Sequence, residues 1–193
     1  MRLLFLCTMS VAIGCSGGAT GTRPEPPPET YTLHMNWLVS HNAALLFPID
    51  NSVPSKNVEA ARADTLFMVQ TELTCEEPTG EPGRSPPSEQ LNANLRGVEE
   101  RAGLDTGEAV DIESVTVKTI IDFIPSGRFC AAVRPLGSQD FEFLPSTGVE
   151  PVFSHATRTA TAELPIARYT DAIAILFEGN TKVNEITVRK KKN

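Results

Sequence analysis

The sequence predicts an all-β protein: an antiparallel β-sandwich or jelly roll of about eight strands with one inserted helix. Apolar and polar residues alternate along several segments, as they do in strands with one buried face. Residues that favour turns separate these segments. Apart from one insertion, no helices lie between consecutive predicted strands, which argues against an alternating β–α fold.

The first strand is predicted at residues 31–40, where apolar residues occupy every second position. These residues are Tyr31, Leu33, Met35, Trp37 and Val39. A continuous apolar run predicts the next strand at 43–49. The remaining strands are predicted at 64–75, 110–124, 128–135, 157–164, 171–179 and 184–190. Gly179 and Asn180 are turn formers, so the last two segments are predicted to form a hairpin.

One segment, residues 76–107, interrupts the strand pattern. It begins as an acidic loop rich in Pro and Gly, and then apolar residues recur at helical spacing: Leu91, Leu95, Val98 and Ala102. Ser88 suits the start of a helix and Gly103 its end. The insertion is predicted to close one end of the sandwich, and the alternative is that it shapes a binding site.

The amino-terminal residues 1–14 have the layout of a secretory signal peptide. A single charge at Arg2 precedes an apolar run that is too short to span a bilayer. Residues 15–30 are rich in Gly, Ser and Pro, a composition typical of a tether that does not fold. Residues 31–193 then form the single predicted domain, at a length that suits one core.

The residues "AIGC", ending at Cys15, resemble the lipobox of bacterial lipoproteins. The resemblance implies that Cys15 becomes the first mature residue and is acylated, which anchors the protein to a membrane. It further implies a cell-envelope location, at the outer membrane or the cell surface. The motif departs from the usual pattern at Ala12, where Leu or Val is common. Ordinary cleavage with Cys15 as a free thiol, giving a secreted or periplasmic protein, is therefore the alternative.

The two cysteines of the predicted domain, Cys75 and Cys130, are expected to form a disulfide, because exported proteins retain such bonds. No metal or cofactor is predicted, since the three histidines are isolated in the sequence. The weaker possibility is a calcium site made by the acidic residues that precede a strand: Asp105, Glu108, Asp111 and Glu113. Their spacing is not that of an EF-hand, and a solvated acidic loop explains them equally.

The charge distribution argues against nucleic acid as a partner. The 17 basic groups fall to 12 when Arg2 and the basic run 189–192 are set aside, against 24 acidic groups. A body of this charge repels phosphate backbones. The basic run itself predicts either a frayed, solvated segment or an electrostatic contact with anionic lipid headgroups.

No catalytic motif occurs, so a non-enzymatic function is predicted. We expect surface recognition, or a structural part in an envelope assembly, with another envelope protein or a surface ligand as partner. Residues 172–192 resemble the closing strands of galactose-binding-like and other carbohydrate-binding jelly rolls. A carbohydrate- or calcium-binding module is therefore the alternative, although Trp37 and Tyr31 are expected to face the core rather than a sugar.

Overall fold

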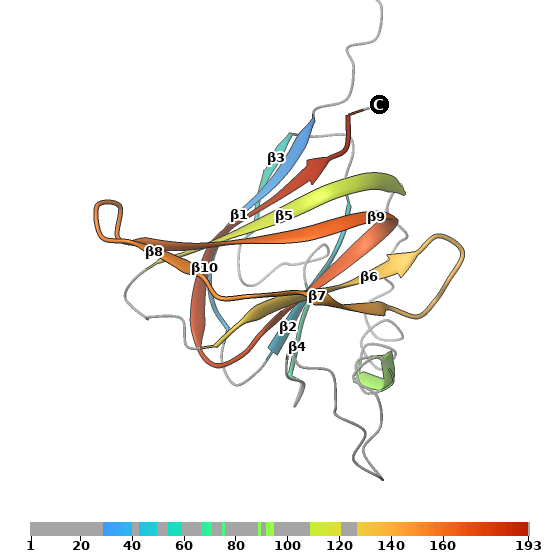
Figure 1. Ribbon diagram of the computed structural model, residues 1–193, viewed down its shortest axis with the longest axis horizontal. Coiled ribbons are helices and arrows are strands. Elements are labelled where there is room, and N and C mark those ends of the chain that lie inside the picture. The colour runs from blue at the N-terminus through green and yellow to red at the C-terminus, as the bar shows by residue number, and fades with distance from the viewer. Residues whose placement is uncertain are drawn as a thin grey trace, which may run out of the picture.

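The computed structural model describes residues 29–39, 43–49, 54–58, 67–70, 75, 89, 92–94, 109–120 and 127–192. Ten strands occur in this part of the chain, which confirms the all-β class (Figure 1). They are β1 (Thr30–Val39), β2 (Ala43–Pro48), β3 (Ser55–Asn57), β4 (Phe67–Gln70), β5 (Val110–Ile120), β6 (Phe129–Pro135), β7 (Glu142–Val149), β8 (Val152–Ser154), β9 (Thr159–Phe177) and β10 (Thr181–Lys190).

The 19-residue strand β9 belongs to two sheets, and this organises the fold. Its first half pairs with β5 and β8, and extends a first sheet in the order β3-β1-β10-β5-β9. Its second half pairs with β2 and β6, in a second sheet ordered β4-β2-β9-β6-β7. In Figure 1, β9 runs beside β5 and then turns across to the second sheet. The chain thus makes a two-layered sandwich from one continuous hydrogen-bonded sheet.

The main core lies between the two layers and draws on both. Tyr31 and Leu33 of β1 share it with Phe47 of β2 and with Phe129 of β6, whose ring meets that of Phe177 edge-on at 4.8 Å. Alternate residues of β2 and β6 point the other way and form a second cluster on the outer face of the second sheet. That cluster comprises Ala44, Leu46, Cys75, Cys130, Ala132, Phe141, Ala172, Ala174 and Leu176.

This burial explains two kinds of sequence pattern. Strands β1, β5 and β10 bury one face and alternate apolar with polar residues. Strand β2 and the second half of β9 are buried on both faces, and their sequences are continuous apolar runs.

The corner where β9 changes sheets is held by buried polar contacts. The hydroxyl of Thr170 donates a hydrogen bond to the carbonyl oxygen of Arg134 at 2.7 Å. The carboxylate of Asp171 accepts one from Nε of Arg134 at 2.8 Å, and its backbone carbonyl accepts one from the N–H of Ile49. These contacts tie β9, β6 and the end of β2 together at the corner.

Three details of the strand prediction are wrong. Segments 157–164 and 171–179 are not separate strands, because both belong to β9. The final hairpin does not form: β10 pairs with β1 and β5, so the turn at 178–180 carries the chain from one sheet to the other. Strands β3, β7 and β8 were not predicted, and β3 runs parallel to β1, so the sheet is mixed.

The cysteine pairing agrees with the sequence prediction. The sulfur atoms of Cys75 and Cys130 lie 2.18 Å apart, at bonding distance, and both residues are buried in the outer cluster. Cys130 points away from Phe129, Ala131 and Val133, which face the main core as the alternation predicts.

The insertion contacts the outer face of the second sheet. Glu89 and residues 92–94 are helical, within the helix predicted from Ser88 to Ala102. The side-chain amide of Asn92 donates to the carbonyl oxygen of Phe141 at 3.0 Å and accepts from its N–H at 2.6 Å. The described part of the insertion therefore lies beside Phe141, a member of the outer cluster that follows the β6–β7 turn. The rest of the predicted helix lies outside the described residues.

Candidate functional site

The strand register defines two ends of the first sheet. At one end, Thr30 pairs with Arg189, and Val110 pairs with Thr170. We call this the proximal end, because here the chain runs into β1 from the predicted tether. At the opposite, distal end, Val39 pairs with Thr181 and Ile120 with Thr159.

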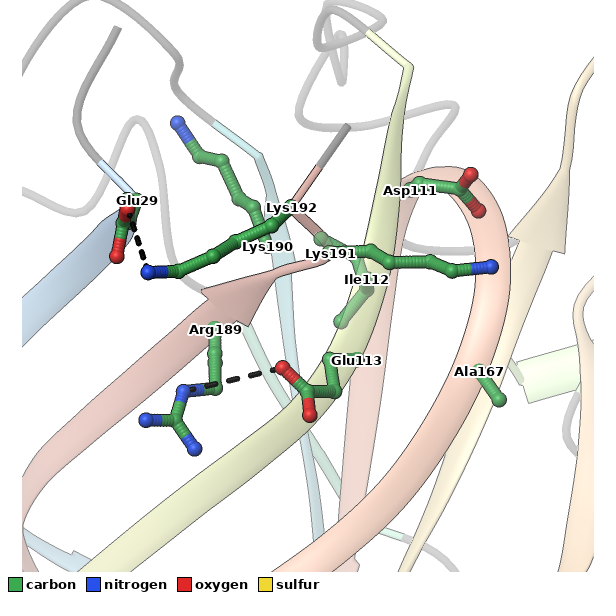
Figure 2. Close-up of a pocket in the computed structure, with 9 residues that line it drawn as sticks. All are labelled: Glu29, Asp111, Ile112, Glu113, Ala167, Arg189, Lys190, Lys191 and Lys192. Atoms are coloured by element: carbon green, nitrogen blue, oxygen red, sulfur yellow. Dashed lines mark ion pairs between the residues drawn. The ribbon is translucent and has the colours of Figure 1, made fainter.

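A cleft of about 550 Å³ lies at the proximal end (Figure 2). It is lined by Glu29, Asp111, Ile112, Glu113, Ala167, Arg189, Lys190, Lys191 and Lys192. All four basic residues of the run 189–192 therefore meet three carboxylates there. The first of those carboxylates comes from the residue that precedes β1.

Irregular pairing around Glu113 shapes this cleft. Against β10, Glu113 is an extra residue, since Ser114 pairs with Arg189 and Ile112 with Lys190. On its other side, two β9 residues fall between the partners of Ile112 and Ser114, and one of them, Ala167, has a φ of 46°. Such bulges redirect side chains and bend the strand. The ladder therefore opens at this point.

The charged side chains of the cleft form exposed ion pairs. Nζ of Lys192 lies 3.0 Å from a carboxylate oxygen of Glu29, and Nε of Arg189 lies 3.9 Å from one of Glu113. More than half of each of these four side chains is exposed. Exposed pairs of this kind contribute between zero and about 1 kcal/mol, so an external anion can exchange with the carboxylates.

The calcium candidates divide between described and other parts of the chain. Asp105 and Glu108 lie outside the described residues. Asp111 and Glu113 both line the cleft, but Glu113 faces Arg189 and the carbonyl oxygen of Asp111 accepts the N–H of Lys191 at 2.9 Å. Within the described ranges, no group of three acidic, histidine or cysteine residues converges in a way that could hold a metal ion.

The distal end carries an exposed apolar hairpin. Strand β8 pairs with residues 159–161 of β9, and residues 155–158 form the turn between them. Val152 is 74% exposed and the next residue, Phe153, is 38% exposed. Because successive strand residues point to opposite faces, exposure of both shows that the hairpin extends beyond the core. The ring of Phe153 packs edge-on against His155 at 4.6 Å.

The sequence prediction missed this hairpin. Three residues are too few for an alternating pattern, and the turn contains no glycine. The only local signal was a pair of neighbouring apolar residues in a polar segment. The proximal cleft was missed for another reason: it depends on the pairing of residues 29–30 with 189–190, which no local pattern encodes.

The other residues singled out in the sequence lie partly inside and partly outside the described ranges. Cys15, the predicted signal peptide and the other residues before Glu29 lie outside the described part of the chain. Tyr31 is buried as expected, whereas Trp37 is only partly buried against the core. His34 lies on the polar face of β1, 3.5 Å from Glu185. Among the helical residues that the structure describes, none forms a helix long and apolar enough to cross a bilayer.

Comparison with protein-family models, curated proteins and solved structures finds no match for this chain.

Proposed function

We propose that this chain is an exported, lipid-anchored envelope protein that binds a partner protein through the β8–β9 hairpin. The apolar residues Val152 and Phe153 at the distal end carry this proposal. They are exposed on both faces of a hairpin that contributes little to the core, and exposed apolar residues in such a position are typical of interfaces. The paired ring of Phe153 offers the kind of aromatic anchor found at the centre of protein interfaces.

Anchoring at Cys15 would place this hairpin where a partner can reach it. The predicted tether joins the domain at Glu29, on the proximal end, and the hairpin lies at the other end of β5 and β9. The hairpin would then lie away from the membrane surface that holds the lipid. This position supports a role in recognising a partner or in forming part of an assembly.

Two properties of the sequence support this proposal. One favours binding over catalysis, and the other favours a protein partner over a nucleic acid. The sequence has no catalytic motif, and its net charge of −7 opposes binding to phosphate backbones. No observation on the described residues favours the carbohydrate- or calcium-binding alternative. Of the aromatic residues expected to stack on sugars, Tyr31 is buried and Trp37 is partly buried.

Site-specific photo-crosslinking in the native cell tests the proposed interface. A photoreactive residue in place of Phe153 should give one defined crosslinked adduct. The yield of this adduct should fall when the same protein also carries the Val152→Ser substitution. The same residue at Gln139, an exposed position in the β6–β7 turn, is the matched control. Adducts of equal yield at both positions, or none at Phe153, would contradict the proposed interface.

A further inference from the structure

The basic run 189–192 is not the frayed segment that its composition permits. Arg189 and Lys190 belong to β10, and the N–H of Lys190 donates to the carbonyl oxygen of Glu29 at 2.9 Å. The N–H of Lys191 donates to the carbonyl oxygen of Asp111, also at 2.9 Å. The backbone of the run is thus fixed beside the residue where the chain runs into β1.

The side chains of the run spread over the proximal end. Figure 2 shows Lys192 extending to Glu29 and Arg189 extending to Glu113, while Lys191 points away from both Lys190 and Lys192. Lys191 and Lys192 are exposed, and the pairs with Glu29 and Glu113 are exposed as well. A surface rich in anions can therefore compete for these cations at little cost.

The position of the run produces a charge asymmetry. The proximal cleft brings together its four basic residues and three carboxylates, whereas the rest of the mature chain carries 12 basic and 21 acidic groups. Among the described residues, the basic side chains of the opposite end are dispersed: Lys118 on β5, Lys182 on β10 and Arg158 in the hairpin turn. Near an anionic surface, such a molecule turns its proximal end inward and its acidic body outward.

We infer that the proximal end binds the anionic lipid headgroups of the membrane leaflet that holds the anchor, with Lys190, Lys191 and Lys192 as the contacting groups. This inference rests on the proposed lipid anchor at Cys15. Thirteen residues separate Cys15 from Glu29, so the domain can stand at most about 50 Å from its anchor. Within that range the tether repeatedly brings the proximal end inside the screening length of about 8 Å, where each basic residue gains attraction to anionic lipid.

The contact would also fix the orientation of the domain relative to the membrane. A lipid anchor alone leaves the domain free to rotate above the membrane, whereas anchor and basic contact together hold the proximal end down. The β8–β9 hairpin, at the distal end, then faces outward.

Amine footprinting of the natively lipidated full-length protein tests this inference. The protein is reconstituted into vesicles of phosphatidylcholine alone, or of phosphatidylcholine with phosphatidylglycerol, and exposed to a water-soluble amine reagent. Mass spectrometry then gives the labelling of each lysine. Labelling of Lys190, Lys191 and Lys192 should fall about fivefold in the anionic vesicles and recover in 1 M salt. Labelling of Lys118 and Lys182 should be the same in both vesicles.

The outcomes separate the inference from the anchor on which it rests. If the protein sediments with both kinds of vesicle and residues 190–192 are labelled equally in both, the anchor stands and the inference is wrong. Equal protection of Lys118 and Lys182 would also overturn it, because the contact would then not belong to the proximal end. If the protein sediments with neither vesicle, the lipid anchor itself is refuted, and with it the inference.

Discussion

The buried ion pair between Arg134 and Asp171 shows how one residue pair fixes a corner. Arg134 is 5% exposed and Asp171 is 6% exposed, and the guanidinium also lies 5.9 Å from the ring of Phe141. The carboxylate sits where β9 passes from one sheet to the other. Its removal would leave a buried cation without its partner, which costs far more than breaking an exposed pair.

Replacing Asp171 by alanine is expected to lower the free energy of unfolding by about 3 kcal/mol. Glu142→Ala is the matched control, because Glu142 pairs with Arg168 at 3.8 Å and both side chains are about half exposed. That variant should lose less than about 0.5 kcal/mol. Urea unfolding curves of the two variants measure the difference, and equal losses would contradict the assigned role of the corner.

Gly127 and Gly137 make a second residue-scale comparison, because both have positive φ but different surroundings. A Cβ at Gly127 would lie 2.6 Å from Cβ of Glu178, whose carboxylate accepts the N–H groups of Cys75 and Arg128. A Cβ at Gly137 meets nothing within 4 Å. Gly137→Ala therefore carries only backbone strain, of about 1 kcal/mol.

Gly127→Ala is expected to cost about 1–3 kcal/mol more than Gly137→Ala, because the added methyl group must displace Glu178 from the turn. Thermal and urea unfolding of the two single variants check this. Identical stabilities would mean that Glu178 can move without loss, and that its hydrogen bonds to Cys75 and Arg128 contribute little.

At the scale of elements, the disulfide joins β6 to Cys75, the residue that precedes the insertion. Cys75 and Cys130 are separated by 55 positions, and closing a loop of this length stabilises the fold by about 4 kcal/mol in the chain-entropy description. The double variant Cys75→Ala, Cys130→Ala should lose about this amount in urea unfolding. A reducing agent should destabilise the wild type similarly and leave the double variant unchanged. Reaction of both thiols with a labelling reagent before any reduction would contradict the bond.

The strands also show how far local sequence patterns can predict this fold. Alternation located β1, β5, β6 and β10, because each of these strands keeps a consistent face toward the main core. The same patterns divided β9 in two, because residues 165–170, which begin with Pro165, do not continue the alternation of 157–164. Pro165 is tolerated because β5 is the only strand that pairs with β9 in the described register there. Which strands pair across the sandwich depends on long-range contacts, so the final hairpin was mispredicted.

At the scale of the whole molecule, the two ends of the first sheet differ in their surface chemistry, and we propose a different binding role for each. The proximal end brings the basic run beside the start of β1, and the distal end carries the exposed apolar hairpin. The sequence revealed the charges of the run, but not that the run lies beside Glu29, the residue that precedes β1. That proximity comes from the antiparallel pairing of β1 with β10, whose partners are about 150 positions apart.

The proposed attachment of the domain to a membrane through Cys15 is tested by mass spectrometry of the mature amino terminus. We expect the native protein to begin at Cys15 and to carry acyl groups, and we expect the Cys15→Ala variant to be released from the membrane fraction. An unmodified amino terminus in the native protein, or a Cys15→Ala variant that stays with the membrane, would contradict it.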